Sequence, residues 1–291
     1  MSVFLTGFAD EAAGDIQGQI AAIRSLGWRH LEARNVDGRN LHDLDAAAFD
    51  DVARALDDAG VRVNALGSNI ANWAKSVEDP VDSSLEETRR AIPRMHRLGV
   101  RQVRIMSFAV LADRAADDQL VDERVARLNT ICALFRSEGL EPLHENCMNY
   151  GGLSWEHTLR LVERVPGLRL VFDTANPGLD LPHSPRQSSW EFFEHIQAHV
   201  AHIHIKDMVW DAEKNAPRYV CPGEGDREVP RILAALRTVG YTGGISIEPH
   251  MQVVFHDTAI SARAEARRAN FQEYGRRMER LVRAAGLEIR P

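Results

Sequence analysis

Short apolar runs and longer amphipathic segments alternate from one end of this chain to the other. In the first amphipathic segment, Ile16, Ile20, Ile23 and Leu26 recur at spacings of 4, 3 and 3, the period of a helix with one buried face. Strand-like apolar runs occupy residues 3–8, 28–33, 61–66, 101–107, 140–145, 168–173, 200–205 and 243–248. Because alternating strands and helices form a parallel sheet, and eight strands close a barrel, the pattern predicts an α/β fold, a (β/α)8 TIM barrel.

The later amphipathic segments have the same character. Most of them end near a glycine, which short turns require because glycine adopts the left-handed conformation at little cost. We predict these helices at residues 45–59, 84–98, 120–138, 154–165, 188–198, 229–239 and 260–285. The least regular region is 207–228, where prolines and glycines predict a long loop folded over the face that carries the strand ends.

The composition is that of one globular domain. No glycine/serine tract, proline-rich stretch or low-complexity block interrupts the 291 residues, so we expect a single TIM-barrel domain over 1–291. Hydrophobic residues make up 44% and charged residues 26%, unlike a disordered chain. The formal net charge of -7 opposes the phosphates of nucleic acid, so we expect no nucleic-acid partner.

Cysteine usage and hydropathy bear on location. Cys132, Cys147 and Cys221 are widely spaced and form no Cys-x-x-Cys pair, which favours a reducing cytoplasm over a zinc knuckle or a redox motif. The first residues lack a basic stretch followed by a sustained apolar region, and no run approaches the roughly 18 apolar residues of a membrane span. We therefore expect a cytoplasmic protein with no membrane partner.

Four metal-seeking side chains stand at or near the ends of predicted strands: Glu145, Asp173, His204 and Glu248. In a closed barrel the carboxyl ends of the strands converge on one face, so these groups would surround one cation. His202 alternates onto the same face as His204 but lies deeper in its strand, which favours a core role for it. The pattern predicts a metal-dependent enzyme.

One imidazole and three carboxylates form a hard, oxygen-rich ligand set. It suits Mn²⁺ best, with Mg²⁺ and Co²⁺ close to it and Zn²⁺ less favoured. Two open positions on such an ion would chelate adjacent oxygens of a sugar, polarise a carbonyl and stabilise an enediolate. Glu145 and Glu248, on opposite sides of the substrate, can then remove and return the proton next to the carbonyl, as isomerases and epimerases require.

Motifs along nearly the whole chain resemble those of the sugar phosphate isomerase/epimerase superfamily, the xylose isomerase-like barrels that include ketose 3-epimerases, inosose dehydratases and endonuclease IV. The resemblance is carried by Gly7-Phe8-Ala9-Asp10-Glu11, Leu31-Glu32-Ala33-Arg34, Gly67-Ser68-Asn69-Ile70, His144-Glu145-Asn146, Phe172-Asp173-Thr174-Ala175-Asn176, His202-Ile203-His204-Ile205-Lys206-Asp207, Gly223-Glu224-Gly225-Asp226 and Ile247-Glu248-Pro249.

The resemblance implies a divalent metal on the same four residues, a small-molecule sugar or keto-sugar as substrate, and homo-oligomers, because members of the superfamily often form dimers or tetramers. The chain departs from the pattern at Asn176, where ketose epimerases commonly have a histidine. A neutral amide can hydrogen-bond a hydroxyl but carries no proton charge. Other polar residues near strand ends are predicted to contact the substrate: Glu32, Ser68, Asn69, Ser107, Lys206 and His250, together with Asn176.

Three other functions use the same parts. A lyase would abstract the same proton and expel a β-hydroxyl, as the resemblance to inosose dehydratases suggests. An apurinic-site endonuclease needs extra histidines from early strands, yet between His42 and His144 the only histidine is His96, in a helical pattern. A non-catalytic sugar-binding barrel would have no need of two opposed glutamates. We therefore place isomerase or epimerase first, lyase second, and the other two last.

Overall fold

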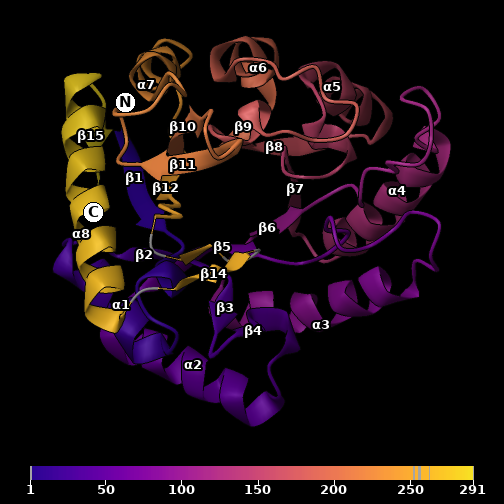
Figure 1. Cartoon of the computed structure of the whole chain (residues 1–291). Helices are drawn as coiled ribbons and strands as arrows, with labels where there is room; N and C mark the ends of the chain where they lie inside the picture. Colours follow the sequence, from indigo (N-terminus) through magenta and orange to yellow (C-terminus); the bar gives the residue numbers. More distant parts are fainter. Residues whose placement is uncertain (1, 252, 255–256, 262, 291) are drawn as a thin grey trace. The chain divides into compact units, whose positions relative to one another are not determined.

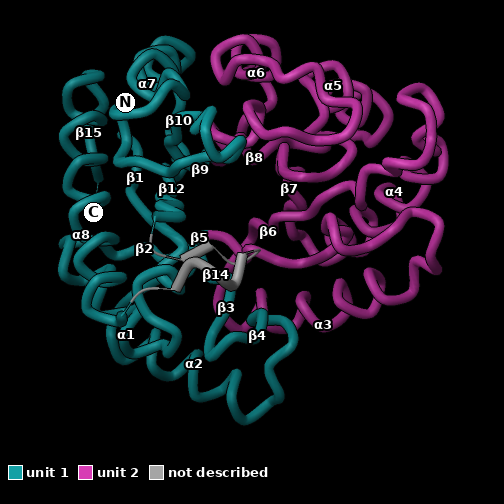
Figure 2. Tube along the Cα trace, in the orientation of Figure 1, with its two compact units in different colours: residues 1–64, 203–291 teal, residues 65–202 magenta. Residues whose placement is uncertain are grey.

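The structure is a computed structural model that describes residues 2–251, 253–254, 257–261 and 263–290 (Figure 1). Within these residues the chain has a parallel sheet of nine strands accompanied by eight α-helices. It divides into two compact units, residues 1–64 with 203–291 and residues 65–202 (Figure 2). Because this division does not test the expectation of one domain over 1–291, that expectation stays a prediction.

The first unit holds both ends of the chain. Strand β1 (Ser2–Gly7) pairs in parallel with β12 (Gly244–Ile247) on one side and with the short β15 (Glu288–Ile289) on the other. Strand β12 continues the sheet to β9 (Val200–Ile205), with Ile245 opposite Ile203. Strand β2 (His30–Ala33) lies beside β1. The carboxyl ends of β1, β9 and β12 therefore point the same way, as parallel pairing requires.

Four helices cover these strands: α1 (Ile16–Ser25), α2 (Ala46–Ala59), α7 (Val229–Thr238) and α8 (Ala264–Ala284). Helices α1 and α2 begin where the side chains of Asp15 and Asp45 accept hydrogen bonds from the backbone N–H groups three residues later. Helix α8 packs beside α1 and α7 (Figure 1) and buries Phe271 and Tyr274. The apolar face of each helix is what attaches it to the sheet.

The second unit is a run of strands in sequence order. Strand β5 (Arg62–Gly67), which begins at the end of the first unit, pairs through residues 65–67 with β6 (Gln102–Ile105), and β7 (Glu141–Glu145) and β8 (Arg169–Asp173) follow, all parallel. Its helices are α3 (Asp82–Leu98), α4 (Val121–Ser137), α5 (Trp155–Arg164) and α6 (Ser189–Ile196). All eight predicted strands are confirmed, with bounds within a few residues.

Three hairpins depart from the predicted alternation. The first is β3 (Asn35–Val36) with β4 (Arg39–Asn40). The second, β10 (Asp207–Asp211) with β11 (Ala216–Val220), occupies much of the segment predicted to be an irregular loop, so that prediction is wrong for these residues. The third is β13 (Val253–Val254) with β14 (Asp257–Ser261), and it moves the start of the last helix from the predicted 260 to 264.

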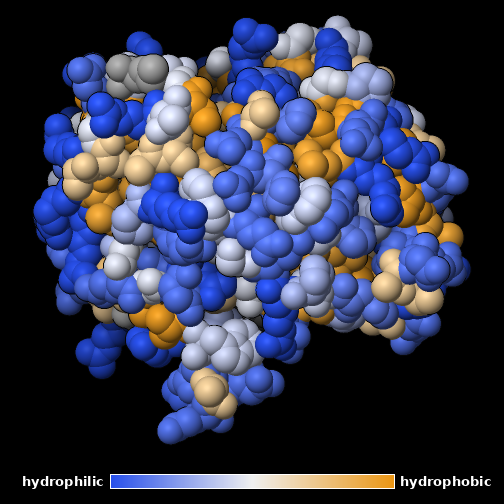
Figure 3. Space-filling view, turned by 90° about the horizontal axis from the view of Figure 1, so that it is seen from above, coloured by the Kyte–Doolittle hydropathy of each residue, from blue (hydrophilic) through white to orange (hydrophobic). Residues whose placement is uncertain are grey.

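No helix in the described part of the chain is long and apolar enough to cross a membrane. The face drawn in Figure 3 carries mainly hydrophilic residues with hydrophobic ones between them. Among the described residues, Val239 is the one large hydrophobic side chain that is exposed, at 50%. Almost all large hydrophobic side chains of the described residues are therefore at least partly buried.

Candidate functional site

In the first unit, a histidine and a glutamate meet where two neighbouring strands end. His204 lies near the end of β9, and Ser246 of β12 is its partner in the sheet. Glu248 comes directly after β12, and its backbone N–H donates to the carbonyl of Ile205 at 3.1 Å. This register brings Oε2 of Glu248 to 3.8 Å from Nδ1 of His204.

The imidazole of His204 is oriented by a third residue. Nε2 lies 3.0 Å from Oε1 of Glu32, at the end of β2, and both side chains are fully buried. Phe8 packs edge-on against the ring at 5.0 Å. A carboxylate accepts from an N–H, so in the neutral ring the tautomer protonated on Nε2 leaves the lone pair of Nδ1 on the side of Glu248, whereas the protonated ring donates on both sides. A carboxylate behind a histidine in this way is typical of metal-ligating histidines.

Glu248 is surrounded by cationic groups. Its Oε1 accepts from Nη1 of Arg34 at 2.7 Å, and its Oε2 lies 3.3 Å from Nζ of Lys206. Nε2 of His250 is 3.7 Å from Oε1. Burial alone would raise the pKa of Glu248, but the charges of Lys206, His250, Arg34 and His204 hold this pKa well below its usual value. The group is therefore a carboxylate at neutral pH.

Two acidic residues in the turn after β1, the short helix Ala9–Glu11, contact two of the basic side chains that surround Glu248. Asp10 accepts from Nε and Nη2 of Arg34 with its two oxygens, at 2.9 and 3.0 Å. Glu11 accepts from the backbone N–H of His250 at 2.8 Å and lies 2.8 Å from its Nδ1. Arg34 and His250 thus each link an acidic residue after β1 to Glu248, which fixes Glu248 in place.

A ring contact and hydrogen bonds connect the second hairpin and the loop after it to the residues that follow β9 and β12. Tyr219 of β11 lies edge-on against the ring of His250, with centroids 5.3 Å apart. Asp207 accepts backbone N–H groups from Gly223 and Gly225 at 2.8 and 3.1 Å, and a Cβ at Gly225 would come within 2.0 Å of Oδ1 of Asp207. Glycine at 225 lets the loop approach the carboxylate this closely.

In the second unit, two carboxylates end neighbouring strands. Glu145 is the last residue of β7 and Asp173 the last of β8, and they are 1% and 0% exposed. Nη1 of Arg104, from β6, lies 3.2 Å from Oε2 of Glu145. The side chain of Asn146 links the two strand ends, because it donates to the carbonyl of Asp173 and accepts from its N–H, at 3.1 and 2.7 Å.

Asn176 lies close to Asp173. Oδ1 of Asp173 accepts from the backbone N–H groups of Ala175 and Asn176 at 2.8 and 3.1 Å. The side chain of Asn176 is buried at 4% exposure, and within the described residues its amide nitrogen has no hydrogen-bond partner. A buried N–H group without a partner costs free energy, so this amide is suited to bind a ligand oxygen.

The hydroxyls of Ser68 and Ser107 form hydrogen bonds within the protein. The Ser107 hydroxyl contacts Asn149, His144 and the N–H of Gly151 at 2.7, 3.0 and 2.8 Å. The Ser68 hydroxyl donates to the carbonyl of Arg104 at 2.5 Å and accepts from the N–H of Ile70 at 3.2 Å. Both residues are fully buried. One hydroxyl has one proton and two lone pairs, and these bonds use most of that capacity. The predicted substrate contact of Ser68 and Ser107 stays a prediction.

His144 is a neutral core histidine. Its ring is fully buried and packs against Gly151, where a Cβ would come within 2.3 Å of it. Burial lowers the pKa of His144 to about 4, although the charge of Glu145 and a hydrogen bond with Asn149 act to raise it. The expected structural role of His144 agrees with this packing.

This low pKa predicts a pH dependence of stability. The unfolded chain protonates His144 below its ordinary pKa of 6.5, whereas the folded chain does so only near 4. The free energy of unfolding therefore falls by up to about 3 kcal/mol from this residue as the pH drops through this interval. Urea unfolding of the wild type and of His144→Gln at pH 7 and pH 4.5 measures the difference. An equal loss in both proteins would contradict the assignment.

Comparison with known proteins identifies the fold. A family model described as xylose isomerase-like TIM barrel matches residues 20–281. The chain belongs to the xylose isomerase-like TIM barrel family. The predicted (β/α)8 fold and the resemblance stated from the sequence are thereby confirmed. None of the curated proteins matches the chain.

Solved structures agree with the family. D-allulose 3-epimerase from Methylomonas sp. has a TM-score of 0.70 and 15% identity, over 96% of this chain and 98% of that one. A xylose isomerase-like TIM barrel protein from Mycobacterium smegmatis, in complex with magnesium, gives 0.68 and 15%, over 97% and 98%. The probable 3-DHS dehydratase AsbF from Bacillus anthracis gives 0.67 and 16%, over 94% and 98%. At these identities the likeness is one of fold.

In this member of the xylose isomerase-like family, the predicted ligands are divided between the units. Glu145 and Asp173 are strand-end neighbours in one unit, and His204 and Glu248 are neighbours in the other. That all four surround one ion stays a prediction. Of the predicted substrate contacts, Lys206 and His250 lie beside Glu248, and Glu32 binds His204. Asn69 is half-buried, and its carbonyl accepts from Lys75 at 2.5 Å.

Five residues without a predicted site role lie around the predicted ligands: Asp10, Glu11, Arg34, Arg104 and Asn146. One signal was available in the sequence. Charged residues inside or shortly after strands, such as Asp10, Arg34 and Arg104, are seldom buried unless they are paired. Which partner each one takes depends on the fold of the family.

Proposed function

We propose that this chain is a divalent-metal-dependent enzyme that acts on a sugar or keto-sugar by moving a proton next to a carbonyl, an isomerase or epimerase. Glu145, Asp173, His204 and Glu248 would hold the ion, and Glu145 and Glu248 would act as acid and base. Membership of the family supports this, since a closed barrel gathers the carboxyl ends of its strands on one face.

The orientation of His204 carries the proposal. Glu32 occupies Nε2 at 3.0 Å, and Nδ1 turns toward Oε2 of Glu248 at 3.8 Å, so two ligand atoms face each other across a gap. A core histidine in a barrel strand has no need of a buried carboxylate behind it. A ligating histidine does, because the carboxylate sets its tautomer and raises its basicity. Glu32 would therefore orient a ligand rather than contact the sugar.

The donor set fits a hard cation. Three carboxylates and one imidazole suit Mn²⁺ best, and Mg²⁺ or Co²⁺ would also bind. The Mycobacterium smegmatis relative, whose structure holds magnesium, agrees with this donor set. When bound, the ion would polarise the substrate carbonyl and stabilise the negative charge that forms when the proton leaves.

The remaining chemistry comes from the side chains. Glu145 and Glu248 would take up and deliver the proton, and their location on separate strands allows one to act on each face of the substrate. The amide N–H of Asn176, which has no partner among the described residues, would donate to a substrate hydroxyl, and Lys206 would bind an anionic or hydroxyl oxygen beside Glu248. Tyr219 and His250 would form a wall on the side of the hairpin.

A lyase is the second candidate. The probable 3-DHS dehydratase among the similar structures favours it, because dehydration begins with the same proton removal. The two outcomes differ after this step: an isomerase returns the proton, whereas a dehydratase expels a β-hydroxyl. Product analysis separates them, since loss of water changes the mass of the product and epimerisation does not.

Removal of the metal tests the proposal. We expect the protein as purified, or after addition of Mn²⁺, to contain about one ion per chain by plasma emission. In deuterated water it should exchange the proton next to the carbonyl of a trial ketose or 3-keto-sugar, followed by NMR. A chelator should abolish exchange and lower the thermal midpoint, because an ion at 100 times its Kd contributes about 2.7 kcal/mol of stability. Exchange that survives complete removal of metal would refute the proposal.

A further inference from the structure

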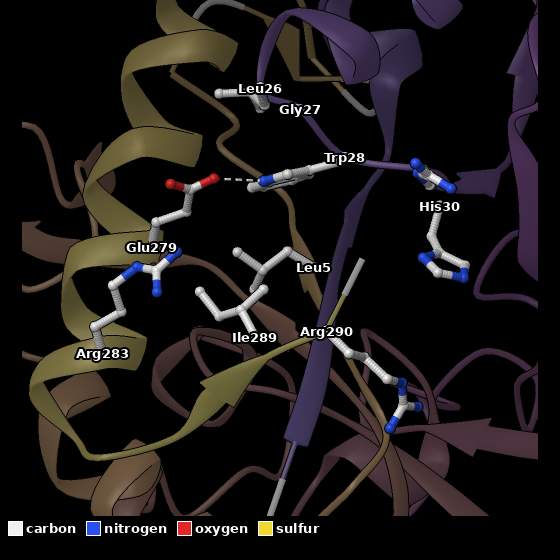
Figure 4. A pocket seen from close by; sticks show the side chains of 10 residues that line it. Leu5, Leu26, Gly27, Trp28, His30, Glu279, Arg283, Ile289 and Arg290 are labelled. Atoms are coloured by element: carbon white, nitrogen blue, oxygen red, sulfur yellow. Dashed lines mark hydrogen bonds between the residues drawn. The ribbon is translucent and has the colours of Figure 1, made fainter.

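A pocket of about 300 Å³ lies within the first unit, away from the strand ends that carry the predicted ligands. Trp28 and His30, at the start of β2, and Ile289 of β15 line it, so it lies where these strands begin (Figure 4). Helix α8 closes one side with Glu279 and Arg283. The residues of the proposed active site take no part in this pocket.

Apolar side chains form one wall. Trp28 and Leu5 are 6% and 1% exposed, which makes them a rigid part of the unit. Figure 4 shows Leu5 and Ile289 between Arg283 and Arg290, with Trp28 on the other side of them from Arg290. Nε1 of Trp28 donates to Oε1 of Glu279 at 2.7 Å, which fixes the indole ring. An aromatic or aliphatic group could pack on this wall.

Positive charge dominates the rim. Arg29, Arg283 and Arg290 line the pocket, and within the described part of the chain none of the three forms an ion pair with a carboxylate. Glu279 is the one acidic residue that lines it. Arginines usually find carboxylate partners on a protein with an excess of acidic residues, as this chain has. Three arginines without a carboxylate partner among the described residues therefore give this pocket a positive charge.

Arg290 is held in place by neutral groups. Its Nη1 donates to the carbonyl of Ser2 at 2.8 Å and its Nη2 to the carbonyl of Thr242 at 3.0 Å. The guanidinium lies 5.1 Å from the centre of the Phe4 ring. These contacts fix the position of the group without neutralising it. Burial lowers the pKa of His30, and the nearby charges of Arg62 and Arg290 lower it further, in accord with a positive environment.

We propose that this pocket binds a small organic anion, whose carboxylate or phosphate contacts Arg283 and whose apolar part packs against Trp28, Leu5 and Ile289, while Arg290 adds positive charge on the other side of this apolar wall. A preformed pocket with an apolar wall and a few placed cations is the usual form of such a site. Guanidinium groups match the planar geometry of carboxylates and phosphates. This inference is independent of the proposed catalytic function, because it uses none of those residues.

Calorimetric titration of the metal-free protein with phenyl phosphate tests the site. We expect one molecule bound per chain, with inorganic phosphate weaker because it lacks the apolar part; a parallel titration with benzoate separates phosphate from carboxylate recognition. Arg283→Gln should weaken binding about tenfold, since it removes a charge-assisted hydrogen bond, and Arg290→Gln should weaken it by a smaller factor, since it removes positive charge from the pocket. Arg89→Gln, which changes an exposed arginine of α3 in the other unit, is the matched control and should bind as the wild type does.

Lys206 of the proposed active site is a competing anion receptor, so Lys206→Met is titrated as well and should retain binding. The proposal is overturned if neither phenyl phosphate nor benzoate binds at concentrations up to about 10 mM, because a Kd above this value is too weak for useful recognition. It is also overturned if Arg283→Gln and Arg290→Gln bind as tightly as Arg89→Gln, or if Lys206→Met removes the binding. Arg283 is exposed on α8, so its variant is expected to fold.

Discussion

Replacement of Glu145 or Glu248 by glutamine is expected to lower the rate of proton exchange by at least about a hundredfold, while the fold is retained. A glutamine has the same shape and can still offer a carbonyl oxygen, but it cannot accept or deliver a proton. General acid–base catalysis contributes about 10²–10⁴-fold to a rate. Exchange of a ketose proton in deuterated water, measured by NMR at saturating Mn²⁺, gives the effect, and circular dichroism checks the fold.

Glu163→Gln is the matched control, because Glu163 is an exposed glutamate on α5. It should leave exchange unchanged. Metal content is measured for every variant, so that loss of the ion is distinguished from loss of the base. If both Glu145→Gln and Glu248→Gln keep more than about a tenth of the wild-type rate, neither carboxylate moves the proton and the two-glutamate mechanism is wrong.

The strands and helices could be predicted because each one is a local pattern. The repeated apolar spacing of Ile16, Ile20 and Ile23 gives helix α1, and the apolar run 168–173 gives β8, with no knowledge of distant contacts. The position of Glu145, Asp173 and Glu248 at strand ends follows from the same local reading. Strand ends are where the βα architecture places its chemistry.

The hairpin β10–β11 and the hydrogen bonds of the two serines could not be predicted in this way. The segment 207–220 contains Asn215 and Pro217, which signal a turn equally well in a loop and in a hairpin. Ser68 and Ser107 stand after strands, as substrate-binding residues often do. Their hydroxyls are used by Arg104, Asn149 and the N–H of Gly151, partners that only the folded chain brings together.

The charged cluster around Glu248 is the clearest case of a feature set by the fold. Asp10, Glu11 and Arg34 are separated from Glu248 by more than two hundred residues of sequence, and β1 and β12 bring the chain segments together by parallel pairing. In the sequence alone, each of these residues has the pattern of an ordinary charged surface residue. Together they are buried, with Arg34 at 7% exposure and Glu248 at 4%, so their pairing decides whether the carboxylates can stay ionised.

Arg34→Met is expected to destabilise the metal-free protein by about 3–5 kcal/mol, the cost of leaving buried charges without their partner. Arg34 donates to Asp10, Glu11 and Glu248, and its guanidinium lies 4.2 Å from the centre of the Phe8 ring, so one substitution removes three charge contacts. Arg34→Lys should recover only part of the loss, because an ammonium cannot bind both oxygens of Asp10 in parallel. Urea unfolding with circular dichroism measures each variant.

Arg54→Met is the control for loss of an arginine, since Arg54 pairs with Asp51 at the surface, with both side chains 69% exposed. It should cost less than about 1 kcal/mol. A second variant, Asp10→Asn with Arg34→Met, should be more stable than Arg34→Met alone, because it removes one of the charges left without a partner. If Arg34→Met unfolds within about 1 kcal/mol of the wild type, these carboxylates do not depend on Arg34, and Glu248 must be held by Lys206 and His250 instead.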